Sequence, residues 1–239
     1  MTRMLKQLTI AGGLAALLLT MSGCKQAADK MKEELAAANN PFPTSSPLHA
    51  PVDRMTRRLI NDPRFVARSQ GLRGEEAQQA GARLGMDGLP RLPHDQLETR
   101  AKLMGALLDK MTVSDCAAST RVETPTDALR AGKAVFGALE KLPQDKIDLW
   151  FELAYNAMVA ELDQAPGSPL TDQQVEETVS AWLASIPDQA QREHSLRVLT
   201  NLSGSSDEDV CQLGRGLYHG VSTLPQPYRG QLAWTLTAS

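Results

Sequence analysis

Residues able to do chemistry are few in this chain, and their spacing does not join them into a site. None of the histidines forms the pair four residues apart that binds zinc on a helix; they are His49, His94, His194 and His219. A serine hydrolase would need its nucleophile on a Gly-x-Ser-x-Gly turn. The nearest stretch, residues 203–206, is better explained as a loop that ends in a helix cap. We therefore predict that the chain is not an enzyme and holds neither a metal nor a cofactor.

Two further patterns look chemical but favour a structural role. The glycine-rich residues 214–220 are only superficially similar to a phosphate-binding loop, because no strand precedes them and the glycine spacing differs. Acidic and amide side chains share one face of a predicted helix, opposite its apolar face; they are Asp148, Glu152, Asn156 and Asp163. The acid of a glycosidase needs a shielded groove. We therefore interpret that face as solvated.

The first residues of the chain have the order of charges and apolar residues found in an export signal. Arg3 and Lys6 precede an uncharged apolar run, residues 8–21, which is too short to span a bilayer comfortably. The following Met21-Ser22-Gly23-Cys24 resembles the lipobox of bacterial lipoprotein precursors. The resemblance implies a signal peptide over 1–23 and a membrane anchor of several acyl chains, palmitate among them, on Cys24. An ordinary cleaved signal or an uncleaved anchor is the alternative.

The same resemblance bears on where the protein resides. In a lipoprotein, Asp at the second mature position favours retention at the inner membrane, whereas this chain has Lys25. We therefore expect a cell-envelope protein at the outer membrane, facing the periplasm. Export also places the two remaining cysteines, Cys116 and Cys211, in an oxidising compartment. Neither lies in a Cys-x-x-Cys motif or beside a histidine, so we predict a structural disulfide rather than a reactive thiol or metal pair.

Composition and turn residues divide the chain after the anchor. Residues 24–51 are predicted to be a tether, because four prolines between positions 41 and 51 favour an extended spacer. Residues 52–239 are predicted to be a single all-α domain. Alanine and leucine dominate there, only 4% of the chain is aromatic, and no segment alternates like a strand.

Residues that typically begin and end helices recur along the domain. Early helices are expected over 52–60, 74–84 and 95–111. Three later helices are predicted to open at a Ser/Thr-Asp pair, to close at Leu/Ile-Pro, and to be followed by a second helix whose first turn holds the proline. These helices span 126–142, 171–186 and 206–224. We therefore predict about eight helices, stacked largely as antiparallel hairpins.

One predicted helix carries a stripe that leaves two interpretations open. Apolar residues recur on it at helical spacing: Ile147, Trp150, Phe151, Ala154, Met158 and Leu162. Core packing is the simpler explanation. The sharper one is a ligand pocket lined by Trp150, Trp182 or Trp234, which a buried carboxylate or histidine would support.

The start of the domain is rich in arginine. Arg54, Arg57 and Arg58 open a cluster that continues through 64, 68 and 73. These side chains are candidates for contact with anionic lipid or an acidic partner, or else for pairing with nearby acids. A formal net charge of −3 argues against nucleic acid. The sequence thus favours a membrane-anchored envelope lipoprotein that binds another envelope protein, as adaptor, assembly factor or inhibitor. An envelope enzyme or small-ligand binder is the alternative.

Overall fold

The computed structural model describes residues 40–70, 72, 75–122 and 125–238, and within these ranges it contains helices and no strand. The all-α prediction is therefore confirmed. The predicted number of about eight helices is too low, since the described residues form eleven α-helices and one 3-10 helix. They are α2 (His49–Ile60), α3 (Pro63–Ser69), α4 (Glu75–Gly88), η1 (Leu89–Arg91), α5 (His94–Leu108), α6 (Val113–Thr120), α7 (Pro125–Leu139), α8 (Gln144–Leu162), α9 (Asp172–Ala184), α10 (Gln189–Thr200), α11 (Asp207–Thr223) and α12 (Tyr228–Ala238).

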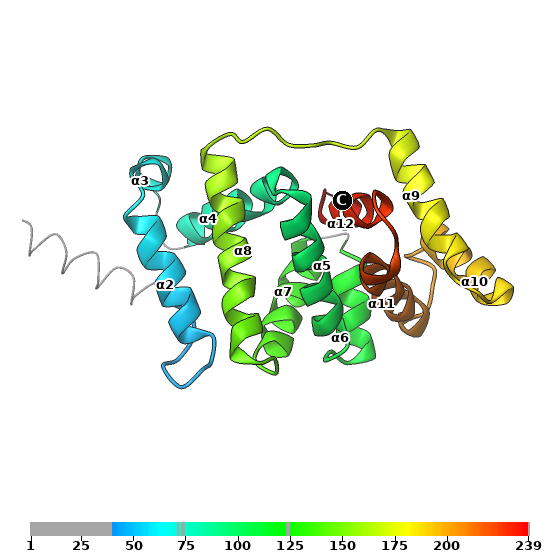
Figure 1. Ribbon diagram of the computed structural model, residues 1–239. Helices are drawn as coiled ribbons and strands as arrows, with labels where there is room; N and C mark the ends of the chain where they lie inside the picture. Colours follow the sequence, from blue (N-terminus) through cyan, green and yellow to red (C-terminus); the bar gives the residue numbers. More distant parts are fainter. Residues whose placement is uncertain (1–39, 71, 73–74, 123–124, 239) are drawn as a thin grey trace, which may run out of the picture.

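The helices form an elongated array (Figure 1). Helices α2 and α3 lie at one end, α9 and α10 lie at the other, and the remaining helices fill the space between them. Residues 165–171, which have no regular secondary structure, run along one edge of the array from α8 to α9. Helices α8 and α9 lie apart in the array and do not form a hairpin (Figure 1).

Side-chain caps explain where several helices begin. The hydroxyl of Thr171 accepts a hydrogen bond from the backbone N–H of Gln174, which completes a capping box at the start of α9. Ser206 caps α11 in the same way through the N–H of Asp209. The predicted openings at 171–172 and 206–207 are therefore confirmed.

Two short helices were not predicted. The Asn61-Asp62-Pro63 stretch ends α2 as expected, but it also begins α3, because Asp62 caps the N–H of Arg64 and Pro63 occupies the first helical position. Helix α6 begins at Val113 with Thr112 as its cap. Both helices have fewer than nine residues, too few for an apolar periodicity to be recognised.

The predicted positions of three prolines are wrong by one to three residues. Pro143 is the capping residue of α8, Pro187 precedes the cap of α10, and Pro225 lies before the turn that leads into α12. A residue that caps a helix has an extended ψ, which proline adopts readily; Pro143 has φ −58° and ψ 149°. Its carbonyl accepts from the N–H of Ile147 and so still begins the helix.

The predicted stacking of antiparallel hairpins does not describe the main contacts. The most extensive ones join helices distant in sequence: α4 with α8, α6 with α11, and α5 with both α11 and α12. Helices α7 and α8, predicted to form a hairpin, contact each other little within the described residues. Arg54 pairs with Asp148 and Arg58 with Glu152, each 94 residues apart, so α2 and α8 run parallel.

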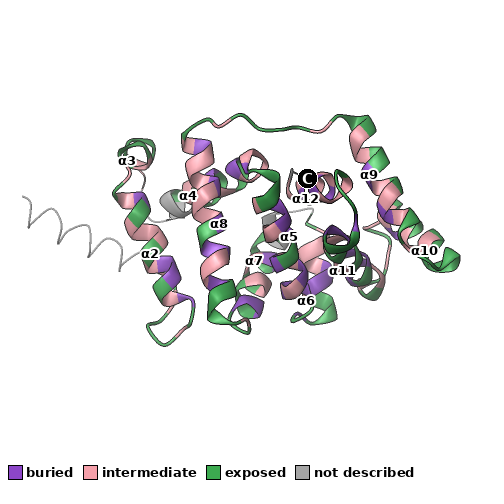
Figure 2. Ribbon diagram, viewed as in Figure 1, coloured by how far each residue is buried: buried purple, intermediate pink, exposed green. Residues whose placement is uncertain are grey.

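Buried residues, coloured purple in Figure 2, are most frequent in the middle of the array. Leu97, Leu107, Leu139 and Ile147 are among the fully buried residues, and they come from α5, α7 and α8. No residue of α3 is buried, and Val198 is the one buried residue of α10. The core therefore lies mainly at the centre, and it extends towards the two ends through Val52 of α2 and Trp182 of α9.

Part of the expected tether packs onto this core. Leu48 is fully buried, and the ring of Phe42 lies edge-on to that of Phe136 with 5.3 Å between centroids. The extended spacer expected for residues 40–51 is therefore not what the structure shows there, because apolar side chains between the prolines have a surface to cover. Residues 24–39 of the expected tether lie outside the described residues.

Candidate functional site

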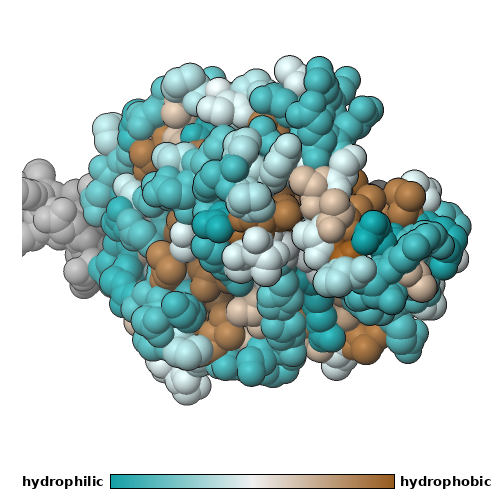
Figure 3. Space-filling view, turned by 45° about the vertical axis from the view of Figure 1, so that its right-hand side comes forward, coloured by the Kyte–Doolittle hydropathy of each residue, from teal (hydrophilic) through white to brown (hydrophobic). Residues whose placement is uncertain are grey.

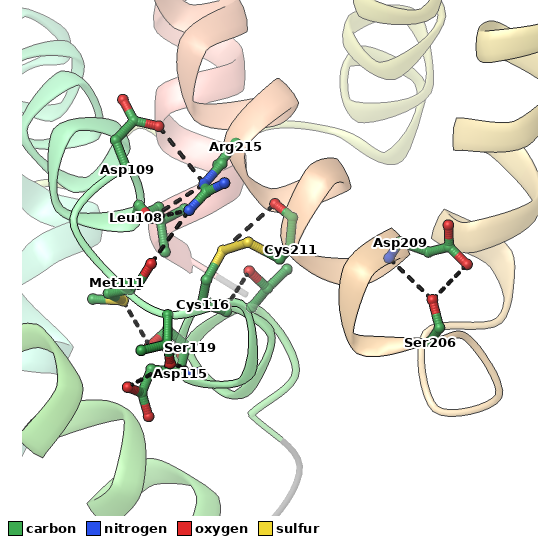
Figure 4. The surroundings of a disulfide bond; sticks show 12 residues. Leu108, Asp109, Met111, Asp115, Cys116, Ser119, Ser206, Asp209, Cys211 and Arg215 are labelled. Carbon is green, nitrogen blue, oxygen red and sulfur yellow. Dashed lines mark hydrogen bonds and ion pairs between the residues drawn. A yellow bond between two sulfur atoms is a disulfide. The ribbon is translucent and has the colours of Figure 1, made fainter.

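Cys116 and Cys211 are joined by a disulfide, as predicted (Figure 4). Their α-carbons are 5.1 Å apart, which is within the usual range for a bridge. Both residues are buried, with 0% and 1% of their surface exposed. Cys116 lies within α6 rather than in a loop, and Cys211 lies in α11. This bond therefore ties α6 to α11 and offers no thiol for catalysis.

Near the disulfide, polar contacts join α11 to the end of α5. The guanidinium of Arg215 donates to the carbonyl of Leu108 at 2.9 Å and 3.2 Å and pairs with Asp109 at 3.7 Å (Figure 4). His219 contacts the same Asp109 at 3.1 Å. These contacts satisfy the carbonyl end of α5, which is a structural role.

Two of the histidines, His194 and His219, each contact one carboxylate. His194 Nε2 lies 2.8 Å from Asp209, whose pKa is lowered first by the Ser206 hydroxyl and then by His194. Within the described ranges, no group of three or more His, Cys, Asp or Glu side chains is placed to hold a metal ion.

The arginine cluster is paired within the chain. Arg57 pairs with Asp53 at 2.8 Å, Arg54 with Asp148 at 2.7 Å, and Arg58 with Glu152. The hydrogen bond that Arg58 donates to Glu152 raises the pKa of Arg58, whose guanidinium carbon also lies 3.5 Å from the centroid of the Tyr155 ring. Arg73 lies outside the described residues.

These pairs show that the acidic face of α8 is not simply solvated. The acidic face of α8 was expected to be solvated, but Asp148 and Glu152 meet the arginines of α2, while Asp163 pairs with Arg64 of α3. The paired side chains remain 44–58% exposed, so each pair contributes little stability. The two pairs between α2 and α8 thus match opposite charges along these helices.

An apolar hollow lies between five helices. Its walls come from α5, α7, α8, α11 and α12, with η1 at the edge, and its volume is about 260 Å³. The lining is largely apolar: Leu89, Ala101, Met104, Val135, Phe136, Trp150 and Leu236. Apolar walls with a few polar groups are typical of small-ligand pockets, and this volume lies just below their usual size range.

One cation faces this pocket without an acidic partner. Arg100 makes neither a hydrogen bond nor an ion pair with any residue that the structure describes, and its guanidinium carbon lies 4.3 Å from the centroid of the Trp150 ring. Burial lowers the pKa of Arg100 and raises that of Tyr218, another lining residue. Arginine nevertheless stays protonated in proteins. The pocket therefore carries one uncompensated positive charge.

Of the three tryptophans proposed to line a pocket, one lines the hollow between the five helices. Trp150 lines it, whereas Trp182 is buried elsewhere with its Nε1 donating to the carbonyl of Gly216 at 3.1 Å. Trp234 is not among the lining residues, and its Nε1 is buried without a partner among the described atoms. The buried carboxylates, Glu98 and Glu161, also lie away from the pocket and contact Gln226 and Arg91.

The sequence contained an unused signal for this site. Leu97, Ala101 and Met104 define the apolar face of the predicted helix over 95–111, and Arg100 stands beside them. A charged residue at the edge of a buried stripe marks a place where the packing leaves room for it. Which other helices would complete the pocket could not be read from the spacing.

Fold and site together define an all-helical protein in which a disulfide joins two helices and an apolar pocket carries a cation. Comparison of the chain with protein-family models, with curated proteins and with solved structures found no match. Over the residues described, no helix is both long and apolar enough to cross a membrane. The function must therefore be inferred from the chain itself.

Proposed function

We propose that this protein is a lipid-anchored lipoprotein of the bacterial cell envelope whose helical domain binds a small ligand. The anchor would be Cys24, which lies outside the described residues, and the location would be the outer membrane facing the periplasm. The pairing of Cys116 with Cys211 is the observation that supports export, because structural disulfides persist in oxidising compartments. It also leaves Cys24 as the remaining cysteine of three.

A labelling experiment tests the anchor. Cells expressing the full chain are given radioactive palmitate, and the protein is then isolated. We expect Cys24→Ala to remain an uncut precursor without label, because no other cysteine follows the lipobox residues. The matched control is the Cys116→Ala, Cys211→Ala double variant, which should still be labelled. Normal labelling of Cys24→Ala would refute the anchor.

The binding role is supported by the pocket beside Trp150. A buried or partly buried charge normally has a partner, because desolvation of a lone ion is costly. Arg100 has none among the described residues, so an anion brought by a ligand would complete the site. The small-ligand role, which the sequence ranks second, therefore has a specific observation in its favour.

A protein partner, ranked first from the sequence, is the second candidate. Large apolar side chains are exposed on α4 and α7, with Met86 69% and Leu129 64% exposed. In Figure 3 apolar side chains form several separate patches between hydrophilic ones. Mild cross-linking of membranes followed by isolation of the protein tests this candidate. A specific envelope protein recovered with the wild type and lost in Leu129→Ser would support it.

A further inference from the structure

We infer that the pocket between α5, α7, α8, α11 and α12 binds a small monocarboxylate with an apolar body, whose carboxylate pairs with Arg100. This inference rests on the small-ligand role proposed above and names the class of ligand. It combines three properties of the pocket: its charge, its donors and its walls.

The charge of the pocket selects a monoanion. Among the residues that line it, Arg100 is the one charged side chain, and no lining residue is acidic. A carboxylate would neutralise the guanidinium and accept two hydrogen bonds from its planar fork. A phosphate monoester would bring close to two charges, and the second would be left without a partner in a largely apolar site.

A second donor lies in the same pocket. The hydroxyl of Tyr218 is 3.5 Å from the carbonyl of Leu236, which is long for a hydrogen bond from a hydroxyl group. This weak contact leaves the hydroxyl able to donate to a better acceptor. A carboxylate has enough lone pairs for both Arg100 and Tyr218.

The walls of the pocket select an apolar body of limited size. Met104, Val135, Phe136 and Trp150 offer aliphatic and aromatic contact surfaces. The volume of about 260 Å³ suits a compact group such as a phenyl ring or a short alkyl chain, and drug-sized ligands use larger pockets. The ligand is thus amphipathic, with one charged end and one apolar end.

Two glycines of α7 provide a matched pair of variants. A Cβ added at Gly132, which lines the pocket, meets no atom within 4 Å, and the same holds at Gly137, which is exposed and is not a lining residue. Leucine at either position removes a helix-weakening glycine and should leave the fold intact. At 132 the leucine side chain would occupy the pocket, and at 137 it would extend into solvent.

Titration calorimetry and tryptophan emission of the full chain test the inference with hydrocinnamate and hexanoate as probes. Their neutral amides and phenyl phosphate serve as comparisons. We expect the carboxylates to bind about 10- to 100-fold more tightly than the amides, the usual effect of hydrogen bonds to a charged group. Arg100→Gln should abolish that preference, and Arg100→Lys should retain part of it. Gly132→Leu should abolish binding, and Gly137→Leu should bind as the wild type does.

The possible failures separate the ligand class from the binding role. If acids and amides bind equally and Gly132→Leu still blocks both, the pocket binds ligands but the inferred carboxylate class is wrong. Tighter binding of phenyl phosphate than of hydrocinnamate would overturn the class as well. If none of these probes binds the wild type, both the inference and the small-ligand role fail.

Discussion

The guanidinium of Arg100 lies over the ring of Trp150, with 4.3 Å between its central carbon and the ring centroid, and no carboxylate accompanies it among the described residues. A cation above an aromatic face gains about 0.5–2 kcal/mol. That contact offsets only part of the loss of hydration, which is also why the pKa of Arg100 is lowered. Arg100 therefore lowers the stability of the protein when no ligand is bound.

Arg100→Met tests that relationship in the absence of ligand. Methionine is long, flexible and apolar, so it can fill the same space without losing hydration. We expect the free energy of unfolding to stay unchanged or to rise by about 1 kcal/mol, because the variant no longer removes a charge from water without giving it a partner. Urea denaturation of both proteins gives the measurement.

Arg121→Met is the matched control for that substitution. Arg121 donates to the carbonyls of Leu202 and Ser205 and pairs with Asp207 at 3.3 Å. Its removal leaves these acceptors unsatisfied and should lower the free energy of unfolding by about 1–3 kcal/mol. An equal loss in the two variants would show that Arg100 is an ordinary structural arginine.

Removal of the disulfide should destabilise the domain markedly. The bridge closes a loop of 95 residues, for which the chain-entropy model gives at most about 4–5 kcal/mol. We expect a Cys116→Ala, Cys211→Ala double variant to melt at a lower temperature than the wild type and to be insensitive to reductant. Calorimetry with and without reductant measures both effects. Two reactive thiols in the denatured, unreduced wild type would contradict the bridge itself.

Features that depend on local chemistry could be predicted from the sequence. The caps at Thr171 and Ser206 require only a side-chain oxygen three residues before a free N–H. The pairing of Cys116 with Cys211 follows once the resemblance around Cys24 assigns that cysteine to lipid. The cap and its N–H partner are close in sequence, and the two cysteines are the ones that remain after Cys24 is assigned.

Features that depend on packing between distant helices could not be predicted. The parallel arrangement of α2 and α8 requires Arg54 to meet Asp148, and either residue alone is compatible with a solvated surface. The pocket likewise needs five helices to converge around Arg100. No periodicity within one helix specifies which partner helix will cover it.

The glycine-rich residues 214–220 show the same limit. Their composition is superficially similar to that of a phosphate-binding loop, and the missing strand and the glycine spacing argue against one. No structural reason for the glycines was apparent from the sequence. In the structure, Trp182 lies against Gly220, where a Cβ would stand 2.6 Å from its Cδ1. The glycines of α11 therefore permit other helices to approach closely, and the reason for them lies in residues elsewhere in the chain.

Acid should weaken the start of α3 through Asp62. The hydrogen bond from Arg64 lowers the pKa of this carboxyl from 3.8 to about 2. Because the folded state has the lower pKa, the contribution of Asp62 to stability is complete above about pH 4 and is lost as the pH falls towards about 2.

Asp62→Asn isolates that contribution. Asparagine also caps helices, so stability near neutral pH should change little. We expect the decline in the free energy of unfolding between pH 4 and 2 to become shallower in the variant, as measured by urea denaturation at a series of pH values. Parallel curves for the two proteins would show that Arg64 does not hold Asp62 in its charged form.

Gly214 and Gly216 should respond in opposite ways to alanine. A Cβ on Gly214 would press against Oγ1 of Thr120, one turn after the disulfide-bonded Cys116, whereas a Cβ on Gly216 would make an ordinary contact 3.5 Å from Trp182. We expect Gly214→Ala to lower the free energy of unfolding by about 1–3 kcal/mol, as overpacked cores do. Gly216→Ala should be neutral or stabilising by up to about 1 kcal/mol, because alanine favours the helix.

A second substitution decides whether Thr120 is the cause. Thr120→Ala removes the atom that a Cβ at position 214 would meet, and it also removes the hydrogen bond from Thr120 Oγ1 to the carbonyl of Cys116. If the close approach of α6 and α11 limits the size of residue 214, Gly214→Ala should cost less in the Thr120→Ala background than in the wild type. The difference between the two costs is the interaction energy of a double-mutant cycle. Equal costs in both backgrounds would place the strain of Gly214→Ala somewhere other than this contact.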